Sequence, residues 1–147
     1  MSAMTQPRRP VVRRLVKLGG ARVAKLDRRP IPHRVIVAAT RYVIPLMFDP
    51  QSATGLEETF ELRVRDPRGG DPDRLALVIS DGTCTVVPGP ALDPGAIATV
   101  GAADLVLLAS GGAGWPALLS AGRLELSGDP FLGLRFPKLF GLPVAVA

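Results

Sequence analysis

Residues Leu75 to Gly89 read LALVISDGTCTVVPG, and this stretch predicts a β-hairpin. Two runs rich in β-forming residues flank the dipeptide Asp81-Gly82, which favours a two-residue type I′ turn. Such a turn pairs Ser80 with Thr83 and thereby sets the register of both strands. Because alternate residues of a strand share a face, one face of the hairpin should point to a core. That face carries Leu75, Leu77, Ile79, Cys84 and Val86.

The segment before the hairpin, from Leu56 to Asp66, predicts a third strand. Apolar and polar residues alternate along it, which is the pattern of a strand with one face in solvent. We expect Glu57 and Glu61 on the solvent side. The loop DPRGGDPD, residues 66–73, joins this strand to the hairpin.

Further helices and strands are predicted on either side of these three strands. Apolar residues at helical spacing predict a helix over residues 33–48. Asp129 should cap a last helix that has Pro130 at its first position. Between the hairpin and that helix the pattern predicts, in order, a strand at 96–100, helices at 102–110 and 116–121, and a strand at 123–127. This order predicts an α+β domain with a single, predominantly antiparallel sheet of about five strands, covered by helices.

Three stretches of the chain, in this order, resemble the SCP2 (sterol carrier protein 2) family of lipid-binding domains. The resemblance runs from about Gly55 to Leu142. Its three parts are the hairpin, AIATVGAADLVLLASG at 96–111, and SAGRLELSGDPFLGLRF at 120–136. The resemblance implies an SCP2-like fold that encloses an apolar tunnel for a lipid tail or sterol-like ligand, without covalent chemistry. It also allows for a second role, because some members are accessory parts of larger enzymes or of lipid-quinone biosynthesis.

The large apolar residues are the candidates for lining such a tunnel. Taken by their periodicity alone, they are typical of a packed core. The family resemblance favours a cavity lined by some of them, since a lipid site is concave and mostly apolar. The candidates are Phe60, Leu62, Leu77, Ile79, Leu105, Leu108, Trp115, Leu118, Phe131, Leu134 and Phe136.

We predict two parts, a basic N-terminal arm at residues 1–29 and, at residues 30–147, the domain that the resemblance identifies as SCP2-like. Residues 1–41 contain 11 Arg or Lys against Asp27 alone, whereas the rest contains 7 Arg or Lys against 12 Asp or Glu. One interpretation of the arm is a flexible, solubilising tail. Another is docking on an anionic membrane, which fits a lipid-handling protein better. Nucleic acid is not expected as a partner, because no aromatic residue stands among the cations for stacking. The candidate membrane contacts are Arg8, Arg9, Arg13, Arg14 and Lys17.

Catalytic and metal chemistry has few residues to draw on. One cysteine, Cys84, and one histidine, His33, exclude an intramolecular disulfide framework, CxxC zinc sites and multi-histidine sites. Cys84 is interpreted as a small buried hydrophobe on the core side of its strand. Carboxylates for acid–base catalysis would need an apolar pocket, which the predicted solvent faces do not offer. We therefore predict a protein that is not an enzyme and that carries no metal or cofactor.

Targeting signals are also not predicted. Arg22 and Lys25 interrupt the region where a signal peptide would be apolar. The uncharged run 105–122 contains Pro116, which disfavours a single membrane-spanning helix. The expectation is a cytoplasmic protein that the arm can attach to the inner membrane face.

Two functions follow from these observations. The first is non-enzymatic binding or transfer of a lipid or sterol-like ligand in an internal hydrophobic tunnel, with the arm favouring anionic membrane surfaces. The alternative is an accessory or interaction module for an enzyme of lipid or quinone metabolism, with a filled core and no free ligand of its own.

Overall fold

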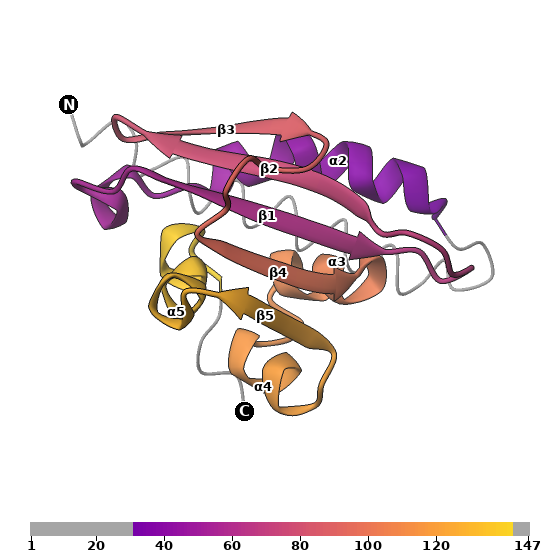
Figure 1. Cartoon of the computed structure of the whole chain (residues 1–147). Coiled ribbons are helices and arrows are strands. Elements are labelled where there is room, and N and C mark those ends of the chain that lie inside the picture. The colour runs from indigo at the N-terminus through magenta and orange to yellow at the C-terminus, as the bar shows by residue number, and fades with distance from the viewer. Residues whose placement is uncertain (1–30, 143–147) are drawn as a thin grey trace.

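A five-stranded sheet organises residues 31–142, the part of the chain that the computed structural model describes (Figure 1). The strand order is β3-β2-β1-β4-β5. The strands are β1 (Glu58–Arg65), β2 (Asp73–Ser80), β3 (Thr83–Pro88), β4 (Ala96–Gly101) and β5 (Leu124–Gly128). The helices are α2 (His33–Met47), the 3-10 helix η2 (Pro50–Ala53), α3 (Ala102–Ser110), α4 (Trp115–Ser120) and α5 (Pro130–Leu139). The predicted α+β fold is confirmed.

The β2–β3 hairpin has the predicted turn and register. Asp81 and Gly82 have φ angles of 52° and 71°, the left-handed values that a type I′ turn requires. Ser80 pairs with Thr83, and the Thr83 hydroxyl donates a hydrogen bond of 2.7 Å to the Ser80 carbonyl oxygen. The apolar face of the hairpin consequently lies against the helices.

The centre of the sheet contains one parallel pair, β1 with β4, among three antiparallel pairs. The parallel pair arises because the chain leaves β3 at one edge and crosses the sheet to reach β4 on the far side of β1 (Figure 1). Hydrogen bonds of 2.8 Å tie this crossover, residues 89–95, to β2 at Gly89 and to β1 at Gly95. The sheet is therefore mixed, but it is predominantly antiparallel as predicted.

The crossover buries one residue that the sequence places in solvent. Glu61 was predicted on the exposed face of β1, and this is wrong, because its exposed fraction is 2%. The Ala91 backbone N–H in the crossover donates to Glu61 Oε1 at 2.8 Å, and Arg63 Nε donates to Oε2 at 2.5 Å. Burial raises the pKa of the Glu61 carboxyl, but these hydrogen bonds and the charges of Arg63 and Arg74 outweigh it, so the pKa lies below its ordinary value. Glu57, which immediately precedes β1, is exposed as predicted.

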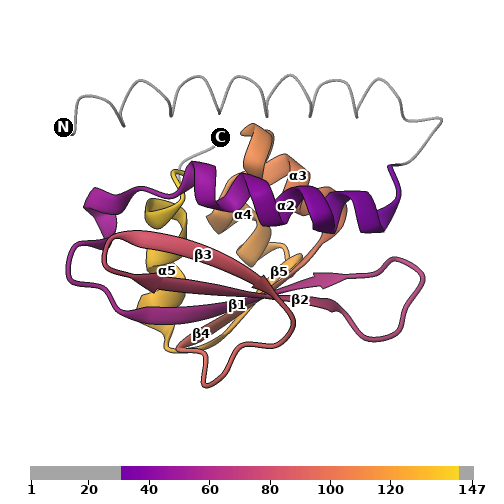
Figure 2. The ribbon, with the colours of Figure 1, turned by 90° about the horizontal axis from the view of Figure 1, so that it is seen from above.

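The helices cover the face of the sheet opposite to the β3–β4 crossover, and the core lies between the sheet and the helices (Figure 2). Asp129 caps α5 as predicted, because its carboxylate accepts the Phe131 N–H at 2.9 Å. α5 then packs closely on β5 at Gly133, where an added Cβ would lie 3.0 Å from Leu126 Cδ1. Pro137 lies inside α5, and the helix continues through it to Leu139. The buried strand residues include Phe60, Leu62, Val64, Leu75, Leu77, Ile79, Val86, Ala98, Val100 and Leu124.

Candidate ligand-binding cavity

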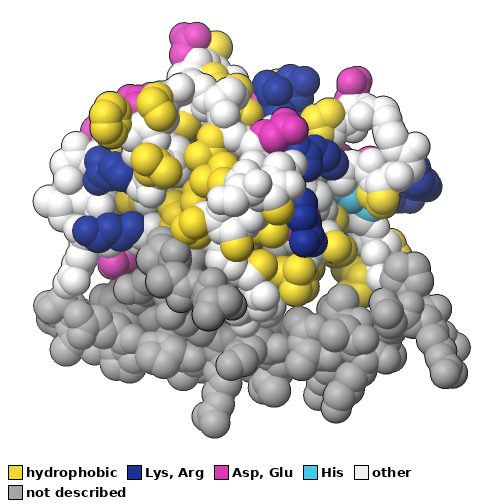
Figure 3. Space-filling model, turned by 90° about the horizontal axis from the view of Figure 1, so that it is seen from below, with side chains coloured by type: hydrophobic (Ala, Val, Ile, Leu, Met, Phe, Trp, Pro, Cys, Tyr) yellow, Lys and Arg dark blue, Asp and Glu magenta, His cyan; other side chains and the backbone are white. Residues whose placement is uncertain are grey.

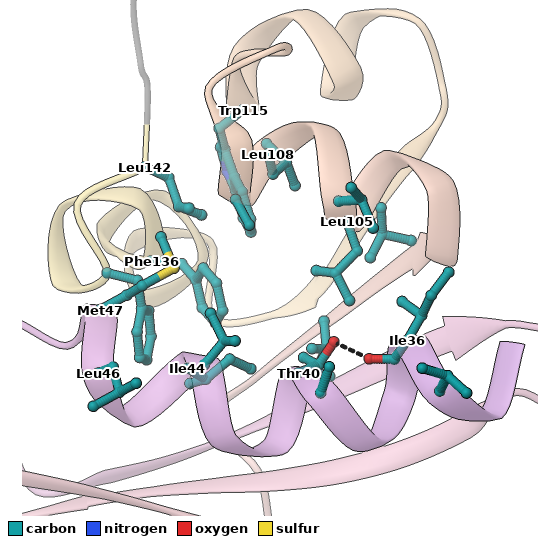
Figure 4. A pocket seen from close by; sticks show the side chains of 18 of the residues that line it. Ile36, Thr40, Ile44, Leu46, Met47, Leu105, Leu108, Trp115, Phe136 and Leu142 are labelled. Atoms are coloured by element: carbon teal, nitrogen blue, oxygen red, sulfur yellow. Dashed lines mark hydrogen bonds between the residues drawn. The ribbon is translucent and has the colours of Figure 1, made fainter. Parts of the chain in front are cut away.

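A cavity of about 530 Å³ lies between α2, α3, α5 and the sheet (Figure 4). This volume is within the range of roughly 300–1,000 Å³ that is typical of small-molecule pockets. Almost all of its lining is aliphatic or aromatic. The lining residues are Ile31, Val35, Ile36, Ala39, Thr40, Val43, Ile44, Leu46, Met47, Leu62, Val100, Leu105, Val106, Leu108, Ala109, Trp115, Phe136, Phe140 and Leu142.

Helix α2 forms one long wall of the cavity. Ile36, Thr40, Ile44 and Met47 recur at the spacing that places residues on one face of a helix, and all four line the cavity. Thr40 brings a hydroxyl to this wall, but that hydroxyl donates to the Ile36 carbonyl oxygen at 2.7 Å (Figure 4). The hydroxyl proton is therefore already used within the helix, and the wall presents a hydrocarbon surface.

Aromatic rings form one end of the cavity. The Trp115 and Phe136 rings are stacked, with centroids 4.8 Å apart and 15° between their planes. Phe140 lies 4.7 Å from Phe136, and Phe60 approaches Phe136 edge-on at 5.6 Å from the sheet side. Contacts between aromatic rings stabilise this arrangement in addition to the contribution from the apolar area that the rings bury. Trp115 is buried, and its Nε1 donor has no hydrogen-bond partner among residues 31–142.

The cavity reaches the molecular surface beside α2. Val35 and Leu46 both line it, and their exposed fractions are 53% and 60%. A side chain that lines a cavity and also meets solvent marks an opening.

The structure divides the predicted cavity residues into three groups. Five line the cavity, namely Leu62, Leu105, Leu108, Trp115 and Phe136. Four are buried in the core and are not part of the lining, namely Phe60, Leu77, Ile79 and Leu118. Phe131 and Leu134 lie on the outer face of α5, with exposed fractions of 78% and 62%.

The cavity wall formed by α2 was not predicted from the sequence. The helical spacing of residues 33–48 was recognised, but it was used only to predict a helix. Periodicity shows which face of a helix turns inward, and it does not show whether that face meets packed side chains or a cavity. The candidates that it missed include Ile36, Thr40, Ile44, Met47 and Phe140.

The remaining candidate groups lie away from the cavity lining or outside the described residues. Desolvation raises the pKa of the Cys84 thiol to about 12, which removes thiolate character at neutral pH. His33 Nε2 lies 2.5 Å from Asp73 Oδ2 and joins the start of α2 to the start of β2. Residues 31–142 hold no cluster of three or more His, Cys, Asp or Glu side chains that could bind a metal ion. Within the same residues, no helix is long and apolar enough to cross a membrane. The arm candidates, Arg8, Arg9, Arg13, Arg14 and Lys17, precede the described residues.

Comparison with known families gives a match over residues 49–141, to the model of the SCP-2 sterol transfer family. The chain belongs to this family. The match covers the sheet and α3 to α5, and it begins just after α2. Comparison with curated proteins gives no match.

Solved structures share the fold of this SCP-2 family member at low sequence identity. Palmitated sterol carrier protein 2-like 2 from Aedes aegypti, solved by NMR, is 17% identical, with a TM-score of 0.59 over 79% of this chain and 100% of that one. The crystal structure of the Aedes aegypti protein is 19% identical, with a TM-score of 0.57 over 72% of this chain and 94% of that one. A stereoselective inverting sec-alkylsulfatase from Pseudomonas sp. is also 19% identical, with a TM-score of 0.57 over 73% of this chain. This chain spans only 16% of the sulfatase.

Proposed function

We propose that the chain binds a lipid with a long apolar tail in the cavity between α2, α3 and α5, and transfers it without covalent chemistry. The observation that carries the proposal is the cavity itself, whose lining is apolar except for the Thr40 hydroxyl and the Trp115 indole nitrogen. The palmitated Aedes aegypti structure supports the ligand class, because the same fold is described there with a fatty acyl group.

The energetics of such a site depend on the tail. Each methylene that moves from water into an apolar cavity contributes about 0.8 kcal/mol. An acyl chain of several methylene groups can therefore bind without a hydrogen bond or ion pair to the protein. The arrangement predicts affinity that grows with chain length and changes little with the head group, since the head remains near the opening beside Val35 and Leu46.

A cavity-filling variant tests this proposal directly. Ala109 lines the cavity from α3, and Ala103 on the same helix faces solvent. Ala109→Phe should weaken binding of the fluorescent fatty acid cis-parinaric acid by about tenfold or more, because the new ring occupies the space of several methylenes. Ala103→Phe is the matched control and should bind as the unmodified protein does. Trp115 is the only tryptophan, so energy transfer from its indole reports occupancy. Equal affinity in both variants would contradict the proposal.

The basic arm has a proposed part in this function. Its cations would hold the protein reversibly near anionic membrane, where each Lys or Arg contributes about 1 kcal/mol. Deletion of residues 1–29 should remove most of the salt-sensitive binding to phosphatidylserine vesicles and leave the affinity for cis-parinaric acid unchanged. Vesicle binding that survives the deletion in full would refute this role of the arm.

A second candidate function is that of an accessory module for an enzyme of lipid or quinone metabolism. The observation that favours it is the Pseudomonas sulfatase, in which this fold accounts for a small part of a larger enzyme chain. Native mass spectrometry of the purified protein separates the two functions. A lipid mass at one per chain supports a carrier, whereas a ligand-free protein that stays empty after incubation with fatty acids, sterols and quinones supports the module.

A further inference from the structure

The outer face of α5 carries an exposed stripe that the cavity does not explain. Phe131, Leu134, Arg135 and Lys138 follow the spacing i, i+3, i+4 and i+7, which places all four on one side of the helix. A single exposed leucine is ordinary on a protein surface, but Phe131 at 78% and Leu134 at 62% stand one turn apart on the same stripe. The other side of α5 is buried against the core, so large apolar side chains lie on both sides of the helix.

Cations complete this stripe. Arg135 and Lys138 are both exposed and continue the stripe toward the end of the helix. α5 contains no acidic residue, and Asp129 just before it directs its carboxylate to the Phe131 N–H. Figure 3 shows the side of the molecule on which α4, α5 and β5 lie, where hydrophobic side chains gather and Lys, Arg, Asp and Glu side chains lie around them.

We propose that this stripe, Phe131, Leu134, Arg135 and Lys138, docks on the surface of an anionic lipid bilayer. An aromatic and an aliphatic side chain suit the boundary between headgroups and acyl chains, and neighbouring cations pair with anionic headgroups. The positive charge of the stripe favours an anionic lipid surface as its partner. A second copy of this chain is disfavoured, because docking stripe to stripe would bring like charges together. The stripe is separate from the basic arm, and its assignment does not depend on it.

The position of the stripe relates docking to the cavity. Phe136 and Phe140 lie on the inner side of the same helix region and form the aromatic end of the cavity. Docking through α5 therefore places that aromatic end one helix diameter from the membrane. A role of this docking in the exchange of ligand between membrane and cavity rests on the proposed function. The docking surface itself is argued only from the exposed residues of α5.

A site-specific probe tests the docking in the full chain. The variant Leu134→Cys carries the environment-sensitive dye NBD on the stripe, and Leu92→Cys carries it at an 88% exposed leucine of the β3–β4 crossover. Cys84 is a minor competitor for the label, because its thiol is partly buried and its pKa is raised to about 12. With phosphatidylcholine vesicles that contain phosphatidylserine, the dye at position 134 should shift its emission to the blue, and the dye at position 92 should not. Vesicles of phosphatidylcholine alone should give a much smaller shift.

Substitutions measure the contribution of each kind of side chain. Phe131→Ser with Leu134→Ser should weaken sedimentation with phosphatidylserine vesicles by about tenfold or more, and Leu92→Ser should leave it unchanged. Arg135→Gln with Lys138→Gln should weaken it by a similar factor. Arg68→Gln is the control for charge, because its side chain is 82% exposed on the β1–β2 loop.

Three results would overturn the proposal. The first is co-sedimentation of the labelled protein while the dye at position 134 stays in water, since another surface then makes the contact. The second is unchanged vesicle binding in the stripe variants. The third is a blue shift that appears without vesicles as protein concentration rises, which would assign the stripe to self-association. The affinity for cis-parinaric acid is read separately in every variant, so loss of docking is distinguishable from loss of the cavity.

Discussion

Glu61 shows how a single residue departs from the pattern of its own strand. By alternation it belongs to the solvent face of β1, yet it is buried beneath the β3–β4 crossover and paired with Arg63. Its neighbours on that face, Thr59 and Arg63, keep partial exposure. Glu61 is buried because the crossover, about thirty residues later in the chain, passes over it. The alternation of residues within β1 carries no information about the path of that segment.

Glu61 should make the stability of the fold depend on acid. Its pKa is lower in the folded protein than the ordinary value of 4.5, so its contribution is fully present above pH 4.5 and is lost as the pH falls through the lower, folded value. Glu61→Gln should therefore flatten part of the decline in unfolding free energy below that pH. Urea unfolding across the acid range measures this, with Glu125→Gln as the control, since that carboxylate is 68% exposed. Identical acid profiles for the two variants would contradict the role of Glu61.

Cys84 should be unreactive while the protein is folded. Desolvation raises the pKa of its thiol to about 12, so almost no thiolate is present at neutral pH. We expect very slow reaction with Ellman's reagent in buffer and rapid reaction in denaturant. An exposed thiol introduced by Leu92→Cys supplies the reference rate for the folded state. Comparable rates for the two thiols would show that Cys84 is accessible.

Among the secondary-structure elements, the end of β5 lies very close to the backbone at the start of β4. Gly128, at the end of β5, has φ of 88°, and a Cβ there would lie 2.6 Å from the Gly95 carbonyl oxygen. Gly122, before β5, has φ of 72°, but a Cβ there would meet nothing within 4 Å. The two glycines therefore share a backbone requirement and differ in their surroundings.

This pair of glycines separates backbone strain from steric clash. Gly122→Ala should cost about 1–2 kcal/mol of unfolding free energy, the usual cost of a left-handed conformation for a residue with a Cβ. Gly128→Ala should cost clearly more, because the backbones of β4 and β5 must also move apart. Urea unfolding of both variants gives the difference. An equal loss of unfolding free energy in the two variants would mean that the backbone at Gly95 can move away from the added Cβ without strain.

The elements also show how much of the fold the sequence could predict. The hairpin register was predictable because Asp81-Gly82 specifies one turn type, and the α5 cap because Asp129 precedes Pro130. The parallel pairing of β1 with β4 was not, since no local pattern states which strand the crossover reaches. Phe131 and Leu134 were predicted to line the cavity because they are apolar and lie within the stretch that resembles the SCP2 family, and hydrophobicity alone does not tell an inward face from an exposed one.

For the whole molecule, an occupied cavity should raise stability. A ligand that binds only the folded state adds about 2.7 kcal/mol to the unfolding free energy at a concentration one hundred times Kd. The melting temperature should therefore rise with added palmitate, and the rise should be lost in Ala109→Phe and kept in Ala103→Phe. Differential scanning fluorimetry measures it. A melting temperature that palmitate leaves unchanged in the unmodified protein would contradict binding in the cavity.

The central position of β1 has a consequence for the growing chain. Because β1 pairs with β4 on one side and with β2 on the other, the segments up to residue 88 can assemble as a three-stranded sheet before β4 has been synthesised. During that interval one edge of β1 has no partner, and it is an edge from Phe60 to Arg65 with a strongly apolar inner face. Open strand edges of this kind recruit other chains. Nascent or truncated forms that stop before residue 96 should therefore aggregate, and pairing with β4 should remove this tendency.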